Sequence, residues 1–140
     1  TIKTTGTAVP TEEGPGNISF VKTSLEAACQ ALGIPLRSSV PVLQGTTVQV
    51  YLGYYQGYPL VLRVEYTDTA TKTVTGLIEL SKIPYTVPGN PAKYTQYANG
   101  RMFRYDNTGP YATYVSFSKV YPPYSSVQSM ADMAEQWARA

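Results

Sequence analysis

Cys29, the single cysteine of this 140-residue chain, lies in the segment KTSLEAACQALG (22–33) and is the first residue to test for chemistry. A nucleophilic cysteine needs a neighbouring base, most often histidine, or another group that stabilises its thiolate. The chain has no histidine, and Cys29 falls mid-helix on the apolar side of a predicted helix. We therefore expect an inert, buried thiol. A lone cysteine leaves open only a disulfide to another chain or to a segment outside this one.

Acidic residues are the next candidates, because without histidine a metal site would consist mainly of carboxylates, and no acidic cluster here has calcium-loop spacing. Glu65 and Glu79 fall on neighbouring predicted strands and could approach each other, as paired-carboxylate hydrolysis requires. We favour the more ordinary interpretation, in which both are solvated surface acids near Arg63 and Lys82. Phosphate-loop, dinucleotide-binding and serine-hydrolase motifs are absent from the sequence. We expect no enzymatic activity, no metal and no other cofactor.

Tyrosine is abundant, with 13 copies, and several of them gather in two segments. The first is YLGYYQGYP (51–59), and the second is YTQYANGRMFRY (94–105), where arginines stand beside the tyrosines. Both residue types are enriched in binding hot spots, although tyrosine also fills strands for purely structural reasons. The candidate receptor-binding residues are Tyr51, Tyr54, Tyr55, Tyr58, Tyr94, Tyr97, Arg101, Arg104 and Tyr105.

Charge and composition narrow the class of partner. The chain has 11 basic and 9 acidic residues, a net charge of +2, and only 14% charged residues. Binders of nucleic acid or anionic membrane concentrate basic charge, so we expect neither partner. No apolar run reaches the roughly 18 residues of a membrane span. A neutral, hydroxyl- and tyrosine-rich composition is typical of virion-surface or exported proteins, and we expect the isolated domain to be monomeric.

The elements that position these residues can be read from periodicity. Residues 22–33 predict a short helix with a capping box formed by Thr23 and Glu26 and a stop at Gly33. Leu25, Ala28, Cys29 and Leu32 share its apolar face. A second helix is expected from Ser125 or Ser126, with an apolar stripe that consists of Val127, Met130, Ala134 and Trp137.

The middle of the chain predicts strands. Alternating segments at 47–55, 58–68 and 73–82 indicate an antiparallel meander, and 101–117 indicates a hairpin. Residues 84–100 are rich in Pro, Gly and Asn and predict a long loop. The fold class is therefore α+β, a mostly antiparallel sheet of about five strands with a short N-terminal helix and a C-terminal helix packed against it. We divide the chain into a flexible arm (1–17), an α+β binding domain (18–124) and a C-terminal helix (125–140) that continues into a further segment.

One stretch of the first helix resembles a known family. SLEAACQAL resembles the S-P-x-A-A-C-Q-A segment of the minor coat (attachment) proteins of filamentous bacteriophages, shared by TspB-like prophage surface proteins. In both, the segment follows a short strand, as NISFVKT (17–23) does here. The matching residues are Ser24, Glu26, Ala27, Ala28, Cys29, Gln30 and Ala31. Leu25 stands where proline is common, and the family's second cysteine has no counterpart, so its disulfide is not carried over.

The resemblance implies a receptor-binding (adsorption) domain at the tip of a filamentous phage. Its partner would be a host surface protein, either a pilus or a Tol-type periplasmic protein, bound through the tyrosine segments or by pairing with an edge strand. Two alternatives remain open. One is a structural virion or pilus-like subunit that assembles through its arm or terminal helix, and the other is a prophage surface protein that binds host immunoglobulin.

Overall fold

The computed structural model describes residues 18–82 and 92–139 of the chain. The predicted arm and residues 84–91 of the predicted loop lie outside them. The elements in chain order are β1 (Ser19–Thr23), α1 (Leu25–Leu32), β2 (Thr46–Tyr55), β3 (Tyr58–Asp68), β4 (Val74–Ser81), β5 (Lys93–Ala98), β6 (Arg101–Asp106), β7 (Ala112–Phe117) and α2 (Val127–Arg139).

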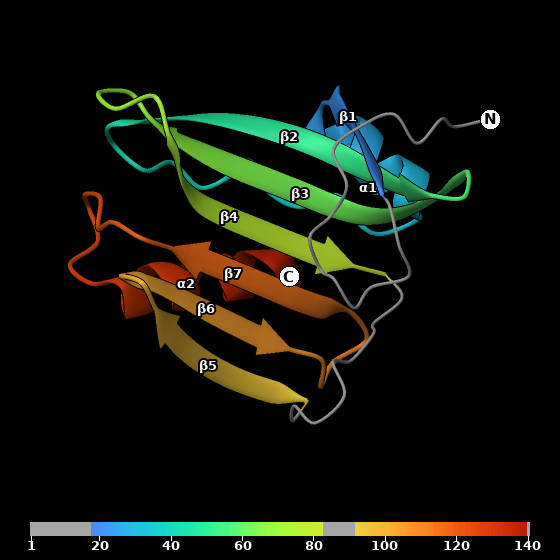
Figure 1. Ribbon diagram of the computed structural model, residues 1–140. Coiled ribbons are helices and arrows are strands. Elements are labelled where there is room, and N and C mark those ends of the chain that lie inside the picture. The colour runs from blue at the N-terminus through green and yellow to red at the C-terminus, as the bar shows by residue number, and fades with distance from the viewer. Residues whose placement is uncertain (1–17, 83–91, 140) are drawn as a thin grey trace.

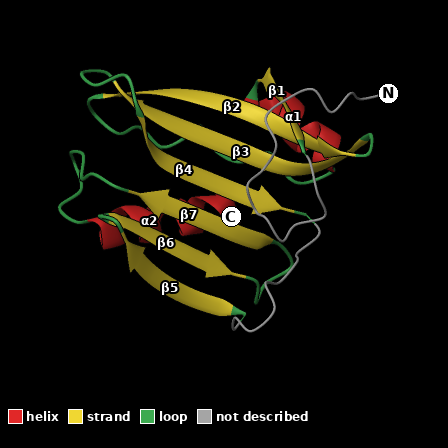
Figure 2. Ribbon diagram, in the orientation of Figure 1, coloured by secondary structure: helices red, strands yellow, loops and turns green. Residues whose placement is uncertain are grey.

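Within the described residues, seven strands form one antiparallel sheet in the order β1-β2-β3-β4-β7-β6-β5. Both helices lie behind this sheet, on the same face (Figures 1 and 2). The predicted α+β class and the two packed helices are confirmed. The expected strand number, about five, was too low. Neither helix in the described ranges is long and apolar enough to span a bilayer.

Strand β5 corrects the prediction of a loop over 84–100. Lys93–Ala98 pair with Arg101–Asp106 along their whole length. The prediction failed because β5 is the last strand of the described sheet, where only β6 among the described strands pairs with it, and Thr95 and Gln96 are exposed. Such a strand does not need the apolar alternation by which buried strands are recognised. The predicted hairpin that follows, β6–β7, is confirmed.

The N-cap of helix α1 lies one residue later in the chain than predicted. Ser24, not Thr23, is the N-cap, and its hydroxyl accepts a hydrogen bond from the Ala27 amide at 3.1 Å. Thr23 is instead the last residue of β1, so the Thr23–Glu26 capping box is not formed. Gly33 ends the helix with a left-handed φ of 70°, as glycine does at this position. Ala28, Cys29 and Leu32 are buried against the sheet as predicted.

The main core lies between the helices and the sheet. Alternate residues of the four central strands point to the helices, and so do the apolar residues of α1 and α2. The predicted stripe of α2 is confirmed, with Met130, Ala134 and Trp137 buried. Arg37 is buried beside the end of this helix, and its guanidinium donates to the carbonyl of Ala138 at 2.7 and 3.0 Å. A cation at a helix C-terminus satisfies a free carbonyl and opposes the helix dipole.

A second polar contact holds the end of β3. The carboxylate of Asp68 is buried and accepts hydrogen bonds from Lys119 Nζ at 2.8 Å and from the Tyr121 hydroxyl at 2.7 Å. It also accepts from the amides of Ala70 and Thr71 in the β3–β4 turn. These hydrogen bonds, that from Lys119 foremost, hold the pKa of Asp68 well below its ordinary value.

The buried thiol gives a first prediction. Cys29→Ala should lower the free energy of unfolding by about 1–2 kcal/mol, because a small, fully buried group is removed from a packed core. Urea unfolding measures the difference, and Gln30→Ala, at an exposed position of the same helix, should change stability by no more than about 0.5 kcal/mol. An unchanged stability of Cys29→Ala would show that the thiol does not contribute to the core.

Asp68 gives a second prediction, on the acid side. Because its pKa is lower in the folded chain than in the unfolded one, its stabilising effect is complete above the unfolded value of about 3.9 and is lost as the pH falls below it. Asp68→Asn should therefore be less stable than the natural chain at pH 7 and should lose less stability on acidification. Thermal melts in this acid range measure both effects. Asp132→Asn, at an exposed carboxylate on α2, is the control and should keep the steep acid dependence.

Candidate binding face

The face of the sheet opposite α1 and α2, here called the helix-free face, carries a row of aromatic and charged side chains. Strand register aligns one residue from every strand, because each is paired directly with the next. From β1 to β5 the row consists of Lys22, Tyr51, Arg63, Glu79, Tyr114, Tyr105 and Tyr94. Side chains alternate between the two faces of a strand, so the residues on either side of this row in each strand point to the helices.

The β1–β3 half of the face is built around Phe20. Its ring lies over Gly53, where an added Cβ would come within 2.8 Å of it. From there the ring meets Tyr51 edge-on, with centroids 6.4 Å apart, and lies 4.6 Å from the Arg63 guanidinium. Both are favourable aromatic geometries. The Arg63 side chain is thus held toward β1 and β2.

The β5–β7 half of the face is aromatic. Tyr94 and Tyr105 face each other across β5 and β6 with ring centroids 5.6 Å apart. Phe103 and Tyr114 make a second pair at 6.2 Å. All four rings are half-buried, and burial is the main cause of the raised pKa of Tyr105. Flat aromatic area with phenol hydroxyls is the composition of protein-binding surfaces.

Between the two halves lies a small charged cluster. Arg63 Nε is 3.0 Å from a carboxylate oxygen of Glu79 and 3.8 Å from one of Glu65. The expectation that both acids lie near Arg63 is confirmed. The expectation of solvated acids was wrong for Glu79, which is only 8% exposed. Lys82 does not join the cluster, since its Nζ lies 3.6 Å from the position of a Cβ on Gly33, at the end of α1.

Burial controls the ionisation of Glu79. Desolvation raises its pKa above the ordinary value, Arg63 opposes this shift, and the neighbouring Glu65 adds to it. Two carboxylates share one guanidinium here, which gives this cluster a formal charge of −1.

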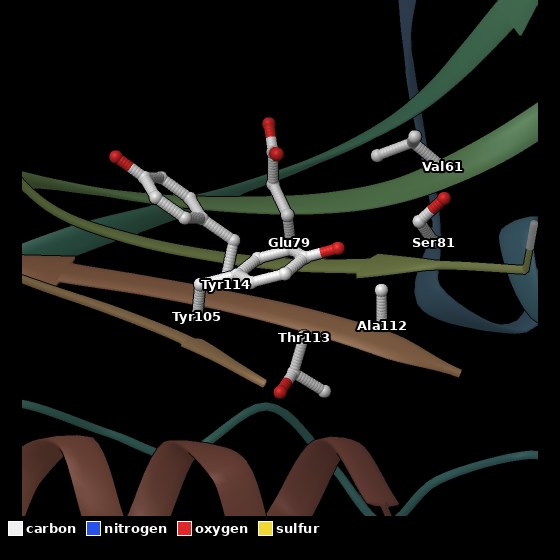
Figure 3. A pocket seen from close by; sticks show the side chains of 7 residues that line it. All are labelled: Val61, Glu79, Ser81, Tyr105, Ala112, Thr113 and Tyr114. Carbon is white, nitrogen blue, oxygen red and sulfur yellow. The ribbon is translucent and has the colours of Figure 1, made fainter. Parts of the chain in front are cut away.

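A recess lies beside Glu79 and is shown in Figure 3. Its lining residues are Val61, Glu79, Ser81, Tyr105, Ala112, Thr113 and Tyr114. The carboxylate of Glu79 and both tyrosine rings rise on the same side of the sheet, whereas the Thr113 side chain points the other way, toward the helix (Figure 3). About 20 Å³ is open to a water-sized group, enough for a single water. A recess of this size cannot enclose a typical substrate.

The sequence-predicted tyrosines and arginines divide between the two faces. The structure brings Tyr51, Tyr94 and Tyr105 onto the helix-free face, together with Arg101, which donates to the Ser116 hydroxyl at 2.9 Å. Tyr55 packs on the same side near Val61, and Tyr58 is 73% exposed beside the β2–β3 turn. The β2–β3 turn therefore does not bring the tyrosines of the first segment (51–59) together in one cluster.

The remaining three residues lie on the helix side. Tyr54 packs against the main core. Arg104 bridges to α2 through Asp132 and Glu135, at 2.5 and 3.4 Å. Tyr97 accepts a hydrogen bond from Gln128 of α2 but stays 60% exposed. Arg104 and Tyr54 thus serve packing.

Sequence reasoning missed Phe20 and Tyr114 and underestimated Glu79. Tyr114 is central, since it stands directly between Glu79 and Tyr105 in the row. Tyr114 could have been found from the alternation within residues 112–117, which places it on the opposite face of the strand from the buried Val115. Pairing across strands far apart in sequence was not readable, and only that pairing brings Tyr114 beside Glu79.

The outer edge of β5 is a second feature of this region. The Asn107 amide donates to the Ala92 carbonyl at 2.7 Å. Because antiparallel pairs alternate between hydrogen-bonded and non-hydrogen-bonded, the backbone groups of Lys93, Thr95 and Tyr97 point away from β6. In the described part of the chain no strand pairs with this edge. Such an edge can accept a further strand.

No site in the described ranges has the donors for a metal ion, since no three acidic or thiol side chains come together there.

Glu79 yields a prediction of its own. An acid whose pKa is raised by folding stabilises the native state below its unfolded pKa, and that stabilisation is lost as the pH rises through the folded value. The natural chain should therefore lose stability as the pH rises from about 4.5 toward neutrality, the side on which Glu79 ionises. Urea melts across this range should show a weaker loss in Glu79→Gln. Glu65→Gln, which removes an equal charge from a more exposed side chain, should retain most of it.

Comparisons of the chain with protein-family models, with curated proteins and with solved structures gave no significant match.

Proposed function

We propose that this chain is a non-enzymatic receptor-binding domain of a filamentous phage tip protein, exposed on the virion, which binds a host pilus or a Tol-type periplasmic protein with its helix-free face. The observation that carries the proposal is the row that crosses the sheet, in which four tyrosines stand in register with Arg63 and Glu79. A stable fold does not need this composition on a face that its helices leave uncovered.

Aromatic rings that are ordered by their neighbours bind at low entropic cost. Tyr94 and Tyr105 hold each other in place, as do Phe103 and Tyr114. When a partner covers these rings, they lose little side-chain freedom. The complex gains a large contact area and hydrogen bonds to the phenol hydroxyls. The outer edge of β5, with which no described strand pairs, adjoins this surface and offers backbone hydrogen bonds to the same partner.

Two further observations favour binding over the other functions considered. The recess beside Glu79 has room for one water-sized group, so it supports no substrate pocket of ordinary size. The apolar stripe of α2 is already buried against the sheet, with Met130, Ala134 and Trp137 in the core. Assembly of a virion or pilus through that stripe would require the helix to leave the core.

Binding of the purified chain to pili and to a Tol-type periplasmic domain tests the proposal, with biolayer interferometry as the measurement. Tyr94→Ala should weaken binding by about thirtyfold, the loss of roughly 2 kcal/mol that marks a hot-spot residue. Tyr58→Ala is the matched control, because it removes a more exposed tyrosine at the β2–β3 turn, and it should change affinity by less than about twofold.

If Tyr58→Ala weakened binding more than Tyr94→Ala, the contact with the receptor would lie at the β2–β3 turn instead. Absence of binding to either class of host protein would contradict the proposed function.

A further inference from the structure

Strand β5 is the most exposed of the described strands. Four of its six residues are exposed, on both faces of the strand: Lys93, Thr95, Gln96 and Tyr97. Its outer edge pairs with no described strand, and the amides and carbonyls of Lys93, Thr95 and Tyr97 point to that side. A row of backbone donors and acceptors of this kind is a template for another strand.

The edge of β5 is regular over its whole length. Natural edge strands are commonly protected from pairing by prolines, bulges or lysines. Lys93–Ala98 contains no proline, and its register with β6 runs without a shift, whereas the β2–β3 and β3–β4 pairings each contain one. Its single charged side chain, Lys93, stands at the end of the strand, 3.8 Å from the carboxylate of Asp106. The middle of the edge is therefore unprotected.

The sequence of β5 is complementary to itself when two copies run antiparallel. A two-fold axis at Thr95 sets Thr95 opposite Thr95 of the second copy, and Lys93 opposite Tyr97 of the second copy. The three outward-pointing residues of each strand then form three pairs that exchange about six backbone hydrogen bonds, two for each pair. The Lys93 ammonium lies beside a tyrosine ring, a favourable contact, and two threonines make a favourable cross-strand pair.

Charge and overlap favour this register over its neighbours. The two copies of Lys93 stand about 14 Å apart along the strands, beyond the ~8 Å over which exposed charges interact at physiological salt. An axis at Lys93 would set two ammonium groups opposite each other, which destabilises a sheet. An axis at Tyr97 would pair Thr95 with Asn99, which lies in the β5–β6 turn with a φ of 54°. The register centred on Thr95 alone pairs all of Lys93–Tyr97 within β5.

We propose that two copies of this chain associate through the outer edges of β5, with the two-fold axis at Thr95, and form one continuous sheet. The axis is perpendicular to the sheet, so both helix-free faces lie on the same side and their β5–β7 halves adjoin. The inference does not rest on the proposed function.

The dimer is weak, because the contact between two six-residue strands is small. It buries less than the ~1,200 Å² of a stable interface, so we expect a dissociation constant of about 0.1–1 mM. At low micromolar concentration the isolated domain is then monomeric, as the sequence led us to expect.

Amide NMR of the whole natural chain, over a dilution series from about 1 mM to 10 µM, tests the dimer. We expect concentration-dependent shifts centred on β5 and its neighbour β6, with slower tumbling at the higher concentrations. Spectra and tumbling that stay the same throughout the series would contradict the proposal. An edge that is instead occupied by another segment of the same chain would give that contradicting result.

Substitutions at Thr95 test the position of the axis. Thr95→Lys sets two ammonium groups opposite each other on the axis and should weaken self-association by at least about fivefold, and Thr95→Glu should do the same with two carboxylates. An equimolar mixture of the two variants should recover association, because each lysine then faces a glutamate. Gln96→Lys is the matched control. It adds the same charge at the next exposed residue, opposite Tyr94 of the second copy, and should change association by less than about twofold.

Equal losses in Thr95→Lys and Gln96→Lys, or a mixture that associates no better than either Thr95 variant alone, would refute the axis at Thr95. If the Thr95 variants do not fold, the natural chain still decides the matter. Dilution shifts centred outside β5 and β6 would then overturn the proposed contact.

Receptor binding separates this inference from the proposed function, when it is measured below about 1 µM, where the natural chain is monomeric. Self-association of a chain that binds neither pili nor a Tol-type protein would leave the dimer standing and contradict the proposed function. Receptor binding by a chain that stays monomeric at every concentration would do the reverse.

Discussion

The register of the seven described strands is the constraint on which the rest of this structure depends. It is fixed on the helix side, where Val50, Val64, Ile78 and Val115 are paired across four strands and buried under α1 and α2. A slip of one residue would turn each strand over and expose this apolar row. The same register places the next residue of each strand on the opposite face. The row from Lys22 to Tyr94 is therefore positioned by a core that it does not touch.

Buried charges are held on both faces of the sheet. Removing a carboxylate from water is costly, and burial raises the pKa of Glu79 while Arg63, 3.0 Å away, opposes that shift. On the helix side, Asp68 and Arg37 have their partners within hydrogen-bonding distance, whereas one carboxylate oxygen of Glu135 is buried without a hydrogen bond in the described part of the chain.

The sequence predicted what depends on neighbours along the chain. The faces of α1 and α2, the meander β2–β3–β4 and the hairpin β6–β7 follow from periodicity, and Cys29 is buried as expected. Strand β5 was not predicted, because an edge strand does not need the apolar alternation by which strands are recognised in a sequence. The Thr23 cap was wrong by one residue, since β1 continues to Thr23 and leaves Ser24 as the first residue free to cap. The recess beside Glu79 was not predictable, because it depends on β4 pairing with β7 rather than with β5.

That pairing also decides what kind of surface the helix-free face is. With β7 inserted next to β4, Tyr114 and Tyr105 extend the row directly from the carboxylate of Glu79. A carboxylate among aromatic rings is partly desolvated, so its attraction for a cation is stronger than at an open surface. The connection from β4 through β5 and β6 to β7 therefore places aromatic rings beside a charge that was otherwise an ordinary surface acid.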